Sequence, residues 1–206
     1  SHPWLAGSSA FYTVEFFEEA RRVLKSTGVL SFWVNMFRIE ERHVKSIVRT
    51  ALEVFPSVHV FRYNSSEIVI IASESDVRIS DIDPERYREG RLGKIFERFR
   101  LPNRESMLAN LEMDPEGARQ FAGKAPIILD DRPILEFELA VTSPNQVVSF
   151  ADLDLELREV PWLSEKTLGG MEEEQRIAVL DRRLENARSR IVALKRLDLS
   201  IQTAKL

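Results

Sequence analysis

Two neighbouring carboxylates are the side chains whose spacing first suggests chemistry. Asp130 and Asp131 stand in the loop Asp130-Asp131-Arg132-Pro133, and paired carboxylates recur in acid–base and metal sites. Adjacent residues of an extended chain point in opposite directions, however, so both rarely act on one atom. We therefore expect one aspartate to pair with Arg132 or to cap a helix, and a catalytic role is the alternative.

The remaining sequence offers no further metal or nucleophile set. It contains no cysteine, which excludes disulfides, thiolate catalysis and sulfur-ligated metals. The histidines, His2, His43 and His59, are far apart and form no H-E-x-x-H pattern. We therefore predict no metal site.

Composition limits the partners of the chain. Its 206 residues are 44% hydrophobic and 30% charged, which is typical of a soluble globular protein. The formal net charge of -4 supplies no basic field for phosphates, so we expect no nucleic-acid partner. No apolar run reaches the ~18 residues of a membrane span, and no signal peptide opens the chain. We expect a cytoplasmic location and leave open a membrane attachment through upstream segments.

Apolar periodicity predicts two helices around a buried strand in the first part of the chain. The first helix starts after Thr13, which is a suitable N-cap. Residues 29–34 form a nearly continuous apolar run, typical of a central parallel strand that is covered on both faces. Residues 40–55 form the second amphipathic helix.

A hairpin follows the second helix. Residues 58–63 and 67–72 are rich in β-formers and are separated by Asn64-Ser65-Ser66. The order helix, strand, helix, hairpin fits one edge of a doubly wound α/β sheet.

The middle of the chain is expected to be mostly helical. The pattern favours helices within 85–99, 104–111 and 115–122. Residues 125–133 then form a loop, and 134–140 form a short strand or extended segment.

The tail differs from the rest of the chain. Residues 141–170 are interpreted as a linker and 171–206 as an amphipathic, coiled-coil-like helix. Its apolar residues alternate spacings of three and four, and we expect them to mediate oligomerisation: Ile177, Leu180, Leu184, Ala187, Ile191 and Leu194. The helix either pairs with a second copy or a partner chain, or lies on its own domain.

Three stretches together carry a resemblance to a known family. They are Pro3-Trp4-Leu5-Ala6-Gly7 with Phe11–Phe17, Leu24–Leu30 with Trp33, and Ala125-Pro126 with Asp130–Phe137. They resemble motifs of the spermidine synthases (polyamine aminopropyltransferases), especially of the bacterial spermidine-synthase-like branch, which is often fused to membrane segments.

The resemblance implies a fold and a reaction. It implies the C-terminal part of a class I methyltransferase-like (Rossmann-type) sheet with a helical region, to which the long C-terminal helix is added. Residues 1–140 would form the C-terminal half of that domain, with the sheet edge in 1–75 and the helical region in 76–140. The family transfers an aminopropyl group from decarboxylated S-adenosylmethionine, or acts on S-adenosylmethionine itself, with a polyamine-type acceptor.

The resemblance also places the donor site outside this sequence. The family's glycine turn, ribose-binding acid and catalytic carboxylate would all precede Ser1, and no G-x-G-x-x-G occurs here. We therefore expect this stretch alone not to catalyse the family reaction.

Seven residues are candidates for the acceptor half of the pocket, namely Asp130 and Asp131 of the loop described above and the five that follow. By resemblance, Tyr63 contacts the polyamine, and Glu67 stands where the family often has glutamine; alternatively, Glu67 only opens a strand. Tyr12 either gates the site or packs on the following helix. Trp33 forms core or pocket wall, and Asn35 either anchors an amine or caps a loop.

Two departures from the family pattern remove polar groups near that pocket. Phe32 stands where the family has glutamine, and Ile128-Leu129 replaces Asn-Thr. Both changes favour an alternative hypothesis, in which the pocket is degenerate and the chain is an interaction domain that assembles through its C-terminal helix.

Overall fold

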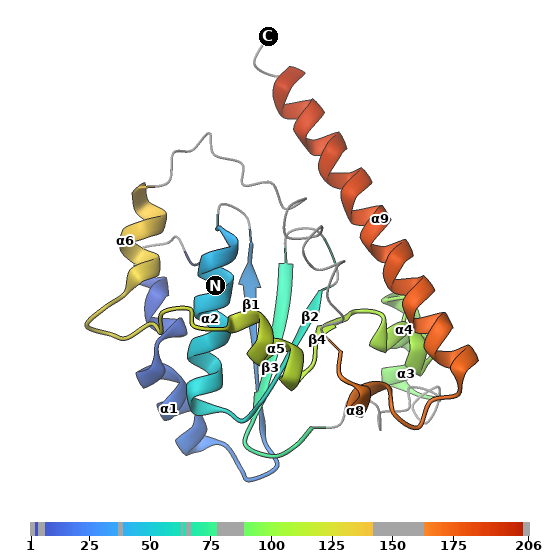
Figure 1. Cartoon of the computed structure of the whole chain (residues 1–206), viewed down its shortest axis with the longest axis horizontal. Helices are drawn as coiled ribbons and strands as arrows, with labels where there is room; N and C mark the ends of the chain where they lie inside the picture. Colours follow the sequence, from blue (N-terminus) through green and yellow to red (C-terminus); the bar gives the residue numbers. More distant parts are fainter. Residues whose placement is uncertain are drawn as a thin grey trace.

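A computed structural model describes residues 3, 7–36, 39–62, 64, 67–77, 89–141 and 163–203. These residues form a mixed α/β structure in which helices pack around a four-stranded sheet. Figure 1 shows α1 and α2 on one side of the sheet and the long α9 on the other side of the molecule.

The first helix begins where its cap residue predicts. A short 3-10 helix, η1 (Ser8–Tyr12), leads into α1 (Val14–Val23). Between them, the Thr13 hydroxyl accepts the Phe16 backbone N–H at 3.3 Å, which satisfies one of the free donors of the first turn. The predicted helix after Thr13 is confirmed.

The second helix and the hairpin also follow the sequence pattern. Helix α2 spans Glu41–Val54, and the two hairpin strands are β2 (Ser57–Arg62) and β3 (Glu67–Ser73). They pair antiparallel with Val60 opposite Ile70. These predictions are confirmed to within a few residues.

The environment of the strand β1 (Val29–Asn35) differs from the prediction. The described strands are ordered β1-β3-β2-β4, and every pairing is antiparallel. The prediction of a central parallel strand is therefore wrong for the described sheet, in which β1 is an edge strand. Helix α2 returns the chain so that β2 runs in the same direction as β1, and β3 fills the space between them in the opposite direction.

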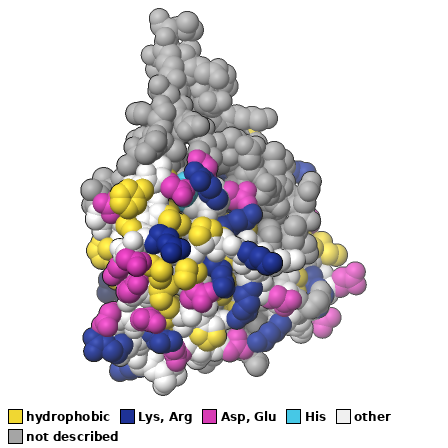
Figure 2. Space-filling view, turned by 60° about the vertical axis from the view of Figure 1, so that its left-hand side comes forward, with side chains coloured by type: hydrophobic (Ala, Val, Ile, Leu, Met, Phe, Trp, Pro, Cys, Tyr) yellow, Lys and Arg dark blue, Asp and Glu magenta, His cyan; other side chains and the backbone are white. Residues whose placement is uncertain are grey.

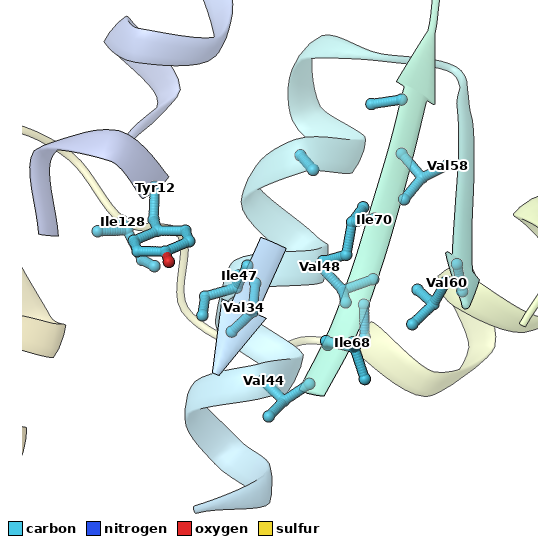
Figure 3. Close-up of a cluster of buried hydrophobic side chains, with 14 of the residues drawn as sticks. Tyr12, Val34, Val44, Ile47, Val48, Val58, Val60, Ile68, Ile70 and Ile128 are labelled. Carbon is cyan, nitrogen blue, oxygen red and sulfur yellow. The ribbon is translucent and has the colours of Figure 1, made fainter. Parts of the chain in front are cut away.

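Apolar side chains cover both faces of the sheet. Alternate residues of the strands point to opposite faces, and one set packs beneath α1 and α2 around Val34, Ile47 and Ile70 (Figure 3). A smaller cluster on the other face includes Phe61 of β2 and Val179 of α9. Each apolar residue removed from water contributes roughly 1.5–3 kcal/mol, so the larger cluster dominates stability.

The helical region holds a strand that the sequence analysis missed. Helix α3 spans Arg91–Arg98, α4 spans Arg104–Leu108 and α5 spans Pro115–Ala122, while β4 (Leu111–Met113) lies between α4 and α5. The predicted helix 104–111 ends early because residues 111–113 pair with β2. Part of the predicted helix 85–99 lies outside the described residues.

Helix α6 replaces a predicted strand. Residues Ile134–Val141 are helical, so the expectation of a strand or extended segment at 134–140 is wrong. Leu135 and Leu139 are buried at a spacing of four residues while Phe137 is exposed, which is helical rather than strand-like burial. Leu, Glu and Ala also favour helices intrinsically.

Two helices lie in the last part of the chain. Helix α8 (Glu165–Leu168) falls within the stretch interpreted as a linker, of which 142–162 lie outside the described residues. Helix α9 spans Glu173–Thr203, and its C-terminal end lies far from the sheet (Figure 1). In the described part of the chain, no helix combines the length and apolar character that a bilayer crossing needs.

Candidate functional site

Two of the three stretches that carry the family resemblance, the first and the last, meet in space. The Val14 N–H at the start of α1 donates to the Ile128 carbonyl at 3.0 Å. The Ser9 hydroxyl of η1 donates to the Glu136 carboxylate of α6 at 2.9 Å, although the two residues are 127 positions apart. The N-terminal motif and the Asp130–Phe137 motif thus form one unit beside β1.

Three of the predicted pocket residues share the sheet face opposite α1 and α2. Asn35 at the end of β1 is paired with Glu67 at the start of β3, and Trp33 lies two residues before Asn35. The Glu67 carboxylate accepts the Asn64 side-chain N–H at 2.7 Å. A carboxylate and a carboxamide therefore lie on neighbouring strands, at the carboxyl end of β1.

A buried arginine supports this end of the sheet. Arg62, the last residue of β2, is fully buried, and its Nε–H donates to the Asn64 backbone carbonyl at 3.1 Å. The sequence analysis did not single it out, although a lone cation at the end of an apolar strand is a visible signal. Tyr63 lies outside the described residues.

Tyr12 is part of the core. Its side chain is buried, its ring lies edge-on to Phe32 with centroids 6.3 Å apart, and its hydroxyl donates to the Trp33 carbonyl at 3.4 Å. This burial favours packing over a gating role, and it places Tyr12 on the helix-covered face (Figure 3).

Asp130 and Asp131 lie on an exposed turn. Leu129 and Arg132 form a bridge around them, and the Asp130 backbone N–H donates to the Glu15 carboxylate at 3.1 Å. Among the described residues, no group of three His, Asp or Glu side chains could hold a metal ion. The two aspartates are on the side of α1, so the predicted pocket residues fall into two groups on opposite faces of the sheet.

Two of the residues that depart from the family pattern, Phe32 and Ile128, pack in or against the core. The Phe32 ring lies 5.2 Å from the Phe17 ring, centroid to centroid, and Ile128 is fully buried. Apolar side chains thus pack at Phe32 and Ile128, where the family resemblance implies polar groups.

His43 forms a polar cluster that the sequence analysis did not identify. Its Nδ1 accepts the Glu40 backbone N–H at 3.0 Å, and its Nε2 lies 3.0 Å from the Glu138 carboxylate, which also binds Arg42 at 2.8 Å. Burial lowers the pKa of His43, partly offset by Glu138. Because both ring nitrogens are engaged, the arrangement joins α2 to α6 and has no free group for proton transfer.

The predicted oligomerisation residues face two environments. Ala187 is buried, as is Val179 of α9, which was not among the predicted residues. Three residues of the predicted seam are about half exposed, namely Ile177 at 51%, Leu180 at 49% and Leu184 at 51%. The side chains of Ile191 and Leu194 lie outside the described residues.

The described residues do not fit the nucleoside of an S-adenosyl donor. Such a nucleoside needs a glycine-rich turn between a strand and the following helix. In sequence, the connections from β1 to α2 (36–40) and from β4 to α5 (Asp114) contain no glycine, and the connection from β3 to α3 (74–90) contains the single Gly90.

Comparisons with known proteins give a weak similarity. No protein-family model matches the chain, and no curated protein matches it. The chain is similar to a solved structure described as a probable spermidine synthase from Corynebacterium glutamicum ATCC 13032, with 22% sequence identity and a TM-score of 0.39. The similarity covers 61% of this chain and 44% of that one, so the chain spans less than half of its length.

Proposed function

We propose that the chain supplies the acceptor-binding part of a spermidine-synthase-like transferase, which transfers an aminopropyl group from an S-adenosyl donor to a polyamine. The observation that carries the proposal is the convergence of two motif-bearing stretches around α1, which the Val14–Ile128 and Ser9–Glu136 hydrogen bonds establish. The sequence resemblance of these stretches thus corresponds to one structural unit.

The polar residues at the end of β1 suit a cationic amine. A carboxylate offers about four acceptor positions, and Glu67 uses one of them for Asn64. An ammonium group can therefore bind the same carboxylate, and charge-assisted hydrogen bonds of this kind are the strong ones. The role of Glu67 and Asn35 would be to hold and orient the amine, since orientation lowers the barrier of a transfer reaction. The donor would bind to residues other than those described.

The experiment is a titration of the protein with 1,4-diaminobutane, followed by tryptophan fluorescence. Trp33 shares the sheet face of Asn35 and Glu67, so binding should change its emission saturably. Glu67→Gln should weaken binding about ten- to a hundredfold, because a charged hydrogen bond contributes roughly 1.5–3 kcal/mol. Glu53→Gln on α2 is the matched control and should bind like the wild type.

Two results would contradict the proposal. One is equal affinity of the wild type and Glu67→Gln. The other is an emission change that persists in Trp33→Phe, because the signal would then come from another tryptophan. Saturable binding that depends on both residues would support it.

A second candidate function is assembly through α9. The half-exposed Ile177, Leu180 and Leu184 favour it. The apolar packing of Phe32 and the buried Ile128, at positions where the resemblance implies polar groups, favours it as well. In this alternative, the domain binds no donor and its exposed apolar residues on α9 bind a second copy of the chain.

A further inference from the structure

A cavity of about 410 Å³ lies at the end of the sheet opposite Asn35 and Glu67. It is bounded by the start of β2, the residues after β3, the start of α5 and helix α8. Because β3 has seven residues, its two ends are about 20 Å apart. The cavity contains none of the residues that the sequence analysis assigned to a pocket, and its volume is in the range of small-molecule sites.

Two buried polar side chains line this cavity without a partner among the described residues. Ser57 and His59 of β2 are only 4% and 3% exposed, yet the Ser57 hydroxyl and the His59 Nδ1 make no hydrogen bond there. Leaving a buried polar group unpaired costs about 1–3 kcal/mol. As residues i and i+2 of one strand, both point to the same face of the sheet.

His59 is neutral at physiological pH. Burial lowers its pKa to about 4, and the carboxylates of Asp114 and Asp76 only partly oppose that effect. A neutral imidazole with hydrogen on Nε2 offers the Nδ1 lone pair as an acceptor. The residue therefore adds an acceptor to the cavity without adding positive charge.

One carboxylate at the cavity is left for a cation. Glu74, Asp76 and Glu116 line the cavity together with the cations Arg119 and Lys166, and Glu74 pairs with Arg21 at 3.5 Å. Lys166 already pairs with Asp76 at 2.7 Å. Glu116 forms no ion pair with any of the described residues.

The guanidinium of Arg119 is engaged by backbone carbonyls of the protein. Arg119 donates to the Pro115 carbonyl at 2.9 Å and to the Pro56 carbonyl, which fixes its guanidinium on the protein. Behind the lining, the buried Asp114 adds a further negative charge. Glu116, which has no ion pair among the described residues, and the buried Asp114 therefore attract a cation and repel an anion.

We propose that this cavity binds a small molecule that carries a primary ammonium group. The three N–H donors of the ammonium would be accepted by the His59 Nδ1, the Ser57 hydroxyl and the lining carboxylate of Glu116. This site is separate from the acceptor pocket proposed at Glu67, and neither proposal requires the other.

The test is a nuclear magnetic resonance titration that follows the imidazole nitrogens of His59. Butylamine, a cation at neutral pH, is compared with butanoate, an anion of similar size. We expect a saturable shift of the His59 Nδ1 resonance with butylamine and none with butanoate. Ser57→Ala should weaken butylamine binding about three- to tenfold, the range for one hydrogen bond.

Two further variants locate the site. Glu116 is exposed, and Glu116→Gln keeps the size of its side chain. This variant should also weaken butylamine binding. Glu67→Gln, at the other end of the sheet, should bind butylamine at His59 like the wild type. Any one of three results would overturn the proposal. They are an equal shift of the His59 resonance with butanoate, no shift with butylamine at tens of millimolar, and a loss of butylamine binding in Glu67→Gln as large as that in Glu116→Gln.

Discussion

At the scale of single residues, the two described histidines show how the same side chain takes different roles when it is buried. His43 has partners at both ring nitrogens, the Glu40 N–H and the Glu138 carboxylate. The Nδ1 atom of His59 has no hydrogen-bond partner among the described residues, and the residue lines a cavity. His43 therefore contributes to the joint between α2 and α6, and His59 is available to a ligand.

Acid should destabilise the protein through His59. Its folded pKa of about 4 is below the ordinary 6.5, so the unfolded chain binds more protons between these values. The stability that neutral His59 supports is complete above about pH 6.5 and is lost as the pH falls towards about 4. The loss is about 3 kcal/mol, measurable by urea unfolding across this range.

A His59→Gln variant isolates this effect. Between the same pH values, its free energy of unfolding should fall less than that of the wild type by about 3 kcal/mol. Asp114 does not obscure the comparison, because its pKa is lowered from 3.8 and its contribution is lost only below that range. Parallel pH profiles of variant and wild type would show that burial of His59 does not set its charge state.

At the scale of elements, Asp114 joins three of them. It follows β4 directly, and its Oδ1 accepts the Gly117 N–H of α5 at 2.9 Å. Its Oδ2 accepts the Ser164 N–H, the Ser164 hydroxyl and the Thr167 hydroxyl, each at 2.6 Å. Burial alone would raise the pKa of Asp114, but these hydrogen bonds outweigh burial and lower it. One carboxylate thus caps α5 and holds α8.

Asp114→Asn should release α8. The substitution keeps the side-chain volume but replaces an acceptor with a donor, which faces the donors of Ser164 and Thr167. We expect a loss of about 3 kcal/mol in the free energy of unfolding and faster hydrogen exchange at the amide of Ser164.

Asp76→Asn is the control for this prediction. Its ion pair with Lys166 also reaches α8 but is exposed, and exposed pairs contribute roughly 0–1 kcal/mol. Similar losses in both variants would mean that α8 is held by general electrostatic attraction and not by the buried carboxylate.

At the scale of the whole molecule, α9 is attached to the domain by one face and leaves a second face open. Arg190 binds the buried Glu112 of β4 at 2.8 Å, and Arg183 donates to the Leu111 carbonyl. The adjacent face carries Leu180 and Leu184. Figure 2 shows another surface, where lysine, arginine, aspartate and glutamate side chains are intermingled; on that face, charges of one sign do not gather.

If the chain assembles through the open face of α9, a charged residue on that face should lower the oligomeric mass. Leu184→Asp should convert oligomers to monomers, because an aspartate in an apolar contact must lose its hydration. Light scattering after size-exclusion chromatography measures the mass. The free energy of unfolding of the monomer should change by less than about 1 kcal/mol, since Leu184 is half exposed.

Ser189→Asp introduces the same side chain at an exposed position of α9 and should leave the mass unchanged. A monomeric wild type, or equal masses for the wild type and Leu184→Asp, would remove the observation that favours assembly. The acceptor-binding proposal would be unaffected by that result.

Local sequence signals predicted the elements whose stabilisation is local. The Thr13 cap, the apolar stripe of α2 and the turn at Asn64 act within a few residues, so α1, α2 and the hairpin were recognisable from the sequence. The sequence also made Asn35 a candidate, because the end of its strand is recognisable by pattern, whereas Glu67 was a candidate through the family resemblance.

Only the tertiary structure decided the features that depend on distant partners. Strand β4 exists because it pairs with Val60 and Phe61, about fifty positions earlier, and α6 is a helix whose Leu135 and Leu139 are buried in the core. The face of α9 that meets the domain, and the separation of Asp130 from Glu67, are likewise set by packing. The spacing of apolar residues in the sequence identifies the apolar side of a helix or strand. That side is buried only when a second element packs against it, and which element does so depends on the whole fold.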